Sequence, residues 1–463
     1  MARSWATLGV DLHLEPAASG GLRRGLTDAL RDAVRTGRLA PGTRLPSSRT
    51  LAADLGIARN TVAEAYADLV AEGWLTARQG SGTRVATGVP TPAGTTPAAP
   101  HRAPSRPRHD LIPGTPDLAA FPRTEWLKAT RRALATAPFH ALGYGDPRGR
   151  PELRTALAGY LARARGVRTD PDTIVITAGF SHALTILGKV LRARGVGTVA
   201  VESYGLDVHW ALLRDAGLAT PALPYDALGT DPREPGGAGA VLLTPAHQFP
   251  MGTPLHPDRR AAVVAWARRT GGLVLEDDYD GEFRYDRQPV GALQGLAPDR
   301  VVYLGTASKS LAPGLRLGWM VLPPALAAEA ATAKGRADTV GALEQLTLAE
   351  FLASGAYDRH VRSSRLRYRR RRDALTTAVA ARAPGVRVTG IAAGLHAVLR
   401  LPPGSEESVV QAAAWQGLAL HGLSFHRHPD AVTEPLDALV VGYGTPPDSA
   451  WAGALEALCR VLP

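Results

Sequence analysis

The chain has a single cysteine, Cys459, among its 463 residues. One cysteine excludes an intramolecular disulfide framework and fits the reducing environment of the cytoplasm. Long apolar runs are also missing: none approaches the length of a bilayer span, and no apolar segment follows a basic start. We therefore expect a cytoplasmic protein with no export signal and no membrane partner. Its length predicts two or three domains.

Lysine is scarce as well. Only four lysines contribute to the 53 basic residues, so arginine carries almost all of the positive charge. The formal net charge is +11 at pH 7. A surplus of this size favours polyanionic partners, nucleic acid above all, although it indicates nothing about the fold.

This scarcity draws attention to Lys309, which follows a predicted buried strand over 301–304 and stands in a turn of hydroxyls and small residues. A desolvated lysine can lose its proton, which arginine cannot, and the free amine forms Schiff bases with aldehydes. Thr306 and Ser308 offer hydroxyls, and the guanidinium of Arg316 suits a phosphate. An aldehyde that carries a phosphate is pyridoxal 5′-phosphate (PLP). Taken alone, the stretch would also fit an ordinary surface lysine.

The first 85 residues predict a small helical domain with a hairpin. Apolar spacing predicts three helices and two strands, over 22–36, 49–55, 57–73, 74–78 and 83–85. Two short helices divided by a glycine turn at Gly56 are typical of a helix-turn-helix. The second of these helices starts with Arg59, Asn60 and Thr61, where such a unit presents side chains to base edges. A three-helix protein-binding module with solvated arginines is the alternative.

Four runs in this domain, 42–49, 60–62, 71–75 and 80–83, resemble the winged-helix domain of the GntR family of bacterial repressors. The resemblance implies a double-stranded DNA operator as partner. It places phosphate or guanine contacts on the arginines, major-groove contacts at the start of the second helix and minor-groove contacts at the wing tip. The implied DNA-binding residues are Arg44, Arg49, Arg59, Asn60, Thr61, Gln79 and Gly80.

A linker is expected over 86–109, where the chain is rich in proline, alanine, threonine and glycine and has almost no large apolar residue. Such a segment cannot bury a core, so it predicts a semi-extended tether. We therefore expect a DNA-binding domain over 1–85 and a second domain over 110–463.

The second domain alternates apolar strands with longer helices, which predicts an α/β fold. Strands are expected over 174–177, 199–202, 240–243 and 273–276, and a helix over 183–194. The backbone amides of Phe180 and Ser181, before that helix, suit a phosphate. Asp277 and Tyr279 follow a strand, where α/β sheets place ligands. Asp277 could hold the proton of a pyridine nitrogen and Tyr279 the ring oxygen, although acidic runs are usually solvated.

Together these residues resemble the fold type I PLP-dependent aminotransferases over roughly 110–463. The resemblance implies a large α/β domain, a small α+β C-terminal subdomain and a homodimer with shared sites. Tyr144 would reach the phosphate bound in the partner subunit, and Lys309 would form the Schiff base. The implied contacts from within one subunit are Phe180, Ser181, Tyr204, Asp277, Tyr279, Thr306, Ser308, Lys309 and Arg316.

Three positions depart from the aminotransferase pattern. Phe249 stands where an asparagine usually holds the ring oxygen, and Val440 aligns with the arginine that holds the substrate carboxylate. The segment around Tyr204 lacks the usual proline, which leaves Tyr204 as a ring or ligand contact. Substitutes for the missing arginine stand nearby in the sequence: His426, Arg427 and His428. We therefore expect cofactor binding without turnover of ordinary α-amino acids, beyond a weak transaminase side activity.

A GntR head on an aminotransferase-like body resembles the MocR/GabR subfamily of regulators. The subfamily implies a PLP-dependent DNA-binding transcriptional regulator that senses PLP, an amine or an amino acid, in a head-to-tail dimer. The alternative is an active aminotransferase with an appended DNA-binding domain.

Arginines are dense over 359–372, on a predicted helix. A solvated face over the small subdomain accounts for them, and an extension of the DNA-binding surface through phosphate contacts is the alternative.

Overall fold

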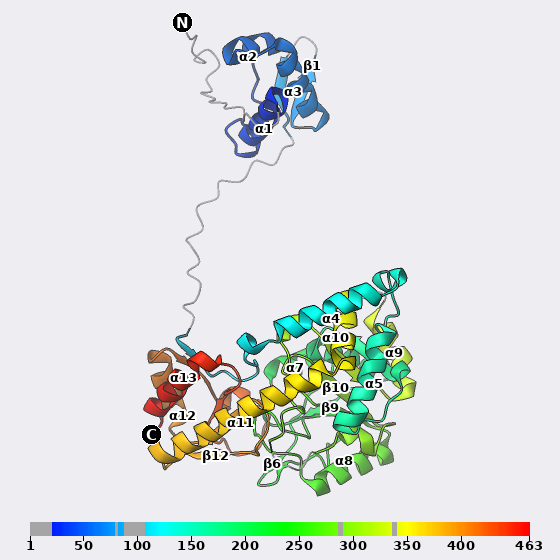
Figure 1. Ribbon diagram of the computed structural model, residues 1–463, viewed down its shortest axis with the longest axis vertical. Coiled ribbons are helices and arrows are strands. Elements are labelled where there is room, and N and C mark those ends of the chain that lie inside the picture. Colours follow the sequence, from blue (N-terminus) through cyan, green and yellow to red (C-terminus); the bar gives the residue numbers. More distant parts are fainter. Residues whose placement is uncertain (1–20, 79–81, 88–106, 286–289, 336–339) are drawn as a thin grey trace. The chain divides into compact units, whose positions relative to one another are not determined.

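The computed structural model describes residues 21–78, 82–87, 107–285, 290–335 and 340–463. The chain divides into two compact units, Met1–Ser105 and Arg106–Pro463 (Figure 1). Within the described residues, no helix is both long and apolar enough to span a membrane.

The amino-terminal unit consists of α1 (Leu22–Arg35), α2 (Ser48–Leu55), α3 (Arg59–Ala71), β1 (Leu75–Arg78) and β2 (Gly82–Val85). Ser47 caps α2 by accepting a hydrogen bond from the Thr50 amide, and Gly56 ends that helix with φ 66°. The predicted helix over 57–73 begins only at Arg59, because Ala58 keeps an extended backbone. The apolar stripes of the three helices and the wing close over one core, so this unit has the predicted winged helix-turn-helix form.

The second unit is built on a six-stranded sheet in the order β4-β11-β10-β9-β8-β5. Its strands are β4 (Ile174–Thr177), β11 (Gly318–Val321), β10 (Val301–Thr306), β9 (Leu273–Asp277), β8 (Ala240–Leu243) and β5 (Val199–Val201). Strand β11 runs antiparallel to both neighbours, and the other pairs are parallel. The carboxyl ends of β5, β8, β9 and β10 therefore meet at one edge, where α/β sheets bind ligands.

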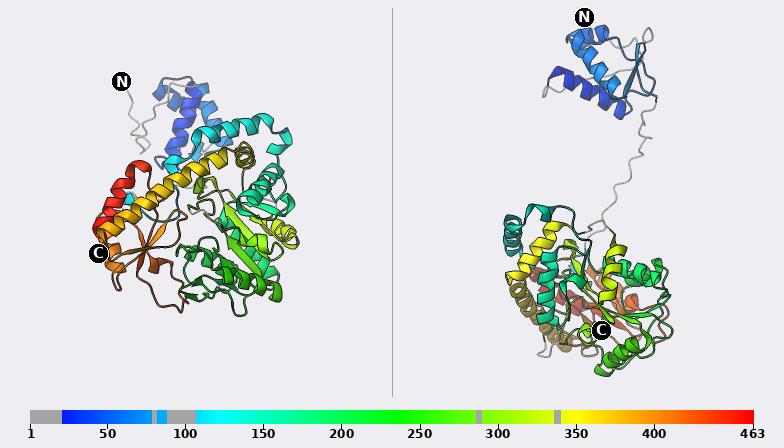
Figure 2. Two further views of the ribbon diagram at one scale, coloured as in Figure 1. Left: turned by 60° about the horizontal axis from the view of Figure 1, so that its bottom comes forward. Right: turned by 90° about the vertical axis from the view of Figure 1, so that its right-hand side faces the viewer.

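Helices cover both faces of this sheet (Figures 1 and 2). Along β10, Val302 and Leu304 pack with α6 (Phe180–Ala193) and α9 (Pro324–Lys334). Tyr303 packs on the other face with α5 (Pro151–Arg165) and α10 (Ala342–Ala353). Burial on both sides explains why the strands read as nearly continuous apolar runs. The helices are α4 (Arg123–Thr136), α5 (Pro151–Arg165), α6 (Phe180–Ala193), α7 (Asp207–Asp215), α8 (Pro257–Thr270), α9 (Pro324–Lys334) and α10 (Ala342–Ala353).

A smaller antiparallel sheet follows, in the order β12-β13-β16-β15. Helix α11 spans the two parts of the unit, because Val361 packs in the large core and Val379 in the small one (Figure 1). The elements of this part are α11 (Ala356–Arg382), β12 (Arg387–Thr389), β13 (Ala397–Arg400), α12 (Glu406–Trp415), β15 (His421–Gly422), β16 (Ala438–Val441) and α13 (Asp448–Val461). Short pairs join β3 (His109–Asp110) to β14 (Leu418–Ala419) and β6 (Tyr225–Asp226) to β7 (Gly229–Thr230).

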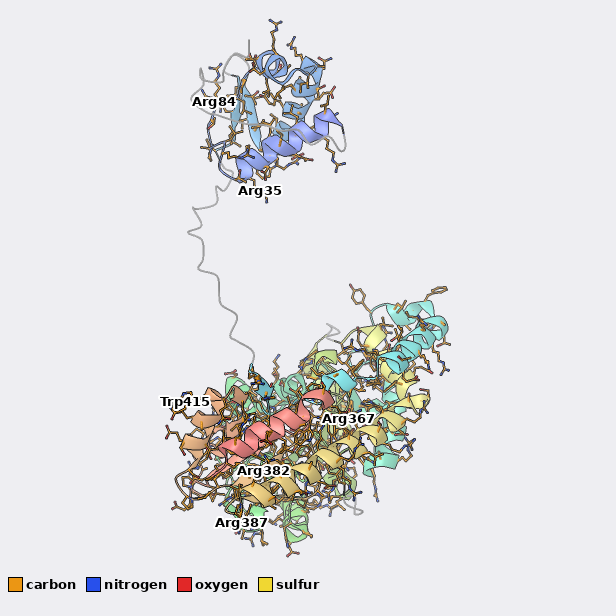
Figure 3. The ribbon with its side chains drawn as sticks, turned by 60° about the vertical axis from the view of Figure 1, so that its left-hand side comes forward. Arg35, Arg84, Arg367, Arg382, Arg387 and Trp415 are labelled. Atoms are coloured by element: carbon orange, nitrogen blue, oxygen red, sulfur yellow. The ribbon has the colours of Figure 1, made fainter. Side chains whose placement is uncertain are left out.

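The arginine-dense segment lies on α11, and its arginines differ in burial and in pairing. Arg371 is buried and pairs with Asp117 at 2.8 Å. Arg367, and Arg382 at the end of the same helix, both labelled in Figure 3, pair with acidic residues of α13. The exposed arginines of the segment are Arg359, Arg362, Arg369 and Arg370. Only part of the segment is therefore a solvated face, and its contact with DNA stays a prediction.

Candidate functional site

A cavity of about 280 Å³ lies where the parallel strands of the large sheet end. A loop of the small subdomain contributes Leu395 and His396 to its wall, and a short helix of the same subdomain contributes His426. The predicted contacts from within one subunit all line this cavity: Phe180, Ser181, Tyr204, Asp277, Tyr279, Thr306, Ser308, Lys309 and Arg316. The fold thus gathers residues from segments more than a hundred positions apart.

Lys309 follows β10 and lines the cavity from a turn. Its Nζ donates a hydrogen bond to the carbonyl of Gly114. Burial lowers the pKa of Lys309, and the carboxylates of Asp277 and Asp280 oppose that shift. The amine is therefore neutral, and nucleophilic, more readily than an exposed lysine would be.

Asp277 ends β9 at the same edge of the sheet. Burial raises the pKa of Asp277 well above its ordinary value, and the charge of Lys309 opposes that rise. Its Oδ1 atom is buried and has no hydrogen-bond partner among the described residues. Because buried polar atoms are seldom left unpaired, this oxygen fits a donor on a ligand, such as a protonated ring nitrogen.

The amino-terminal end of α6 forms another corner of the cavity. Gly179 precedes the helix with φ +84°, and a Cβ there would lie 3.1 Å from Arg316 Nη2. Arg316 Nη2 donates to the carbonyl of Ala178, and the hydroxyls of Thr306 and Ser308 lie 2.8 Å apart. Helix amides, a guanidinium and two hydroxyls together suit a phosphate group.

Polar side chains also surround Tyr279. Its hydroxyl lies 3.1 Å from His247 Nδ1, and the same nitrogen lies 2.8 Å from Asp280 Oδ2. Since a carboxylate only accepts, His247 carries its proton on Nδ1 and donates it to Asp280. The Tyr279 hydroxyl therefore lies beside the His247–Asp280 pair at the wall of the cavity.

The predicted DNA contacts lie in the amino-terminal unit. Arg44 forms a backbone bridge to Arg84 of the wing strand β2, so its side chain stands beside the wing. Exposed side chains are those of Arg44, Arg49, Arg59 and Asn60, and Thr61 is half-buried. Gln79 and Gly80 lie outside the described residues. The starts of α2 and α3 thus offer exposed donors of the kind that contact DNA.

Two family models match the chain. "Bacterial regulatory proteins, gntR family" matches residues 22–85, and "Aminotransferase class I and II" matches residues 114–425. The chain is 35% identical to the HTH-type pyridoxine biosynthesis transcriptional regulator PdxR of Corynebacterium glutamicum over 94% of each chain. It is 33% identical to the probable rhizopine catabolism regulatory protein MocR of Rhizobium meliloti over 90% of each chain.

The chain belongs to the GntR family, MocR type. Kynurenine aminotransferase of Pyrococcus horikoshii aligns with a TM-score of 0.68 at 25% identity, over 77% of this chain and 91% of that chain. A Thermus thermophilus aspartate aminotransferase mutant aligns with a TM-score of 0.65 at 23% identity, over 78% and 100%. The predicted fold class is confirmed, including its PLP-dependent, aminotransferase-like body. The MocR-type chain is a DNA-binding transcriptional regulator, as the sequence predicted.

Two residues that depart from the aminotransferase pattern, Phe249 and Val440, lie in different places in this MocR-type regulator: one in the cavity wall and the other outside it. Phe249 lines the cavity and packs edge-on against Tyr279 and His426, with ring centroids 5.9 and 5.2 Å apart. Val440 is fully buried in β16, in a small core with Val398, and does not line the cavity. The Val440 side chain therefore makes no contact with the cavity in this structure.

No arginine takes the place of the expected carboxylate ligand among the described lining residues. Lys309 and Arg316 are the sole lysine and arginine there. Of the three candidate substitutes, His426 lines the cavity, whereas Arg427 and His428 do not. Arg427 instead donates to the carbonyls of Ala431 and Thr433, in its own loop.

Sequence reasoning missed many of the other lining residues, among them Glu202, His209, His396, His421 and Phe425. Burial lowers the pKa of His209 to about 4 and that of His396 to about 3, so both are neutral at pH 7. Burial raises the pKa of Glu202 to about 7. These residues come from separate segments without a shared motif, so the sequence carried no signal that they meet.

Tyr144 does not join the others. Its side chain is fully exposed and lies outside the cavity of its own subunit. Its predicted role requires a partner subunit and stays a prediction.

Proposed function

We propose that this regulator binds PLP covalently through Lys309, and that the cofactor, or an amine that engages it, changes operator binding by the amino-terminal unit. One observation carries the proposal: a buried amine of lowered pKa shares a cavity with the unpaired Oδ1 of Asp277. PLP supplies an aldehyde for the amine and a ring that accepts electrons. Asp277 would hold the ring nitrogen and Tyr279 the ring oxygen, with the phosphate at the end of α6.

The absorption spectrum of the full-length protein with PLP tests this. We expect a visible band in the parent that is absent from Lys309→Ala. Lys128→Ala is the matched control, because Lys128 is exposed on α4 and pairs with Glu125; it should keep the band. A band that persists in Lys309→Ala would place the attachment elsewhere, and no band in the parent would refute cofactor binding.

Operator binding is the second half of the proposal. Fluorescence anisotropy with a duplex that the protein selects from a random library should show a different Kd with and without PLP. Lys309→Ala should bind the duplex but lose the response. Arg59→Ala, at the exposed start of α3, should weaken binding in both states. The Corynebacterium relative is named for pyridoxine biosynthesis, which supports the cofactor itself as a signal.

We propose that the functional form is a homodimer, with Tyr144 completing the phosphate site of the partner subunit. Phe139 and Tyr144 are fully exposed, and Leu127, Leu134 and Leu142 are at least 49% exposed. A cluster of this kind on one segment is typical of an interface. Phe139→Asp should shift the mass measured by light scattering toward the monomer, whereas Val432→Asp, on another exposed apolar residue, should not.

The domain boundaries proposed are a DNA-binding domain over 1–85, a linker over 86–109 and a cofactor domain over 110–463. Division of the chain between Ser105 and Arg106 supports them.

An active aminotransferase is the second candidate function. Among the described residues, the cavity has no lining arginine beyond Arg316, which disfavours this function. Steady-state transamination with common amino donors above the rate of Lys309→Ala would support it.

A further inference from the structure

His426 lines the cavity on the side of Tyr279. It ends the short helix η7 (Leu423–His426) and packs against Phe249, which packs in turn against Tyr279. Its side chain is buried, and the Gly205 amide donates to its carbonyl at 2.8 Å. The ring is therefore held in one place.

Hydrogen bonding determines the tautomer of His426. Its Nδ1 lies 3.2 Å from the carbonyl oxygen of Gly205, which can only accept, so Nδ1 carries the proton. The other nitrogen, Nε2, then presents a lone pair. That atom is buried and has no hydrogen-bond partner among the described residues.

A second proton on His426 is disfavoured at neutral pH. Burial lowers the pKa of His426 to about 4, and His421 lowers it further, whereas the bond to Gly205 and the charge of Asp207 oppose the shift. The aromatic rings of Phe249 and Phe425 pack edge-on against the imidazole and bring no countercharge. His426 is therefore an uncharged residue of the cavity wall whose Nε2 acceptor has no partner among the described residues.

We propose that His426 Nε2 selects effectors whose far end carries a hydrogen-bond donor, such as the hydroxyl of an amino alcohol, over effectors that end in a carboxylate. A carboxylate there would face a lone pair, and the lining cations, Lys309 and Arg316, are placed for the aldehyde and the phosphate. Leaving a buried acceptor unpaired typically costs a factor of about ten in binding. The inference deepens the proposed function and rests on it, because the amine must engage the bound cofactor.

Matched amines test the selection on the PLP-loaded protein. Ethanolamine and propanolamine are compared with the amino acids of the same length, glycine and β-alanine, and with ethylamine and propylamine. The shift of the cofactor band on titration gives each Kd. We expect the alcohols to bind about tenfold more tightly than the amino acids. Equal affinities, tighter amino acids or no binding by any amine would overturn the inference.

Two variants tie the preference to this residue. His426→Phe keeps an aromatic ring without the acceptor, so the alcohols should fall to the affinity of the plain alkylamines. His426→Arg supplies a guanidinium and should reverse the preference toward the amino acids. A preference that survives in both variants would contradict the assignment to His426.

Nitrogen-15 NMR of the histidine-labelled protein without cofactor provides a readout that does not depend on PLP. We expect an unprotonated Nε2 at pH 7, assigned to His426 by its loss in His426→Phe. A protonated Nε2 would overturn the inference. If no cofactor band forms, the proposed function fails and the inference fails with it; if the band forms but the amines are not distinguished, only the inference fails.

Discussion

Lys309 and Asp277 are held in the cavity against their ordinary protonation states. Burial lowers the pKa of the amine and raises that of the carboxyl, and each charge opposes the shift of the other. A ligand that takes up the amine covalently and brings its own proton to Asp277 relieves both groups. This is the residue-level reason why PLP fits the site.

Asp277→Asn should weaken PLP binding by about 1.5–3 kcal/mol, the usual contribution of a hydrogen bond to a charged group. An asparagine keeps the size of the side chain but does not stabilise a protonated ring nitrogen. The measurement is an absorbance titration of the cofactor-free protein. Asp299→Asn, on an exposed aspartate, serves as the control and should bind as the parent does. Unchanged affinity in Asp277→Asn would mean that the ring nitrogen is held elsewhere.

Among the elements, helix α6 joins a structural constraint to a binding role. Gly179 and Gly195 flank it, and both have positive φ, +84° and +79°. A Cβ at Gly179 would also approach Arg316, whereas no atom of the described residues lies within 4 Å of a Cβ at Gly195. The pair therefore separates backbone strain from damage to the phosphate corner.

Gly179→Ala and Gly195→Ala should each lower the free energy of unfolding by about 1–2 kcal/mol, because alanine is strained at positive φ. Only Gly179→Ala should also raise the Kd for PLP, since the methyl group displaces the guanidinium of Arg316. Urea unfolding and absorbance titration measure the two effects. Equal loss of affinity in both variants would place the phosphate away from the start of α6.

Helix α11 carries arginines with different roles on different faces. Arg371 is buried and bonds the buried Asp117, whereas Arg362 is exposed on the same helix. Removing one partner of a buried ion pair leaves an uncompensated charge.

Arg371→Ala should therefore destabilise the carboxy-terminal unit by about 3–5 kcal/mol. Arg362→Ala should change its stability by less than about 0.5 kcal/mol, as most surface substitutions do. Urea unfolding followed by tryptophan fluorescence measures both. A small effect of Arg371→Ala would show that Asp117 finds another partner or takes up a proton.

For the whole molecule, buried ionisable groups link stability to pH. Burial raises the pKa of Glu202, Glu276 and Glu282 to about 7, from an ordinary value of 4.5. Between those values the folded state binds more protons than the unfolded state. The free energy of unfolding that these groups contribute is therefore full below about pH 4.5 and falls as pH rises through 7.

Glu202→Gln removes one of these groups. Relative to the parent, the free energy of unfolding of the variant should rise as pH is raised from about 5 to 8, because the parent alone must then ionise a buried carboxyl. Glu202 lines the cavity, so unfolding is measured without PLP. A difference between variant and parent that is constant over this range would mean that Glu202 ionises near its ordinary pKa.

The sequence by itself determined the elements and the family. Strands β4 and β8 coincide with the predicted strands over 174–177 and 240–243, because the apolar pattern of a strand is a local property. The motifs around Lys309 and Asp277 are local too, so a resemblance could place each predicted contact without the fold.

Only the tertiary structure decided which polar groups share the cavity and which of them carry a proton. His209 comes from α7, and His396 and His426 come from two segments of the small subdomain. The lone pair on His426 Nε2 depends on the carbonyl of Gly205, more than two hundred residues away in the chain. The burial of Val440, and of Arg371 on the same helix as exposed Arg362, is decided in the same way. Burial and protonation depend on neighbours that are distant in the chain, and the local pattern of apolar residues in the sequence does not predict which residues these are.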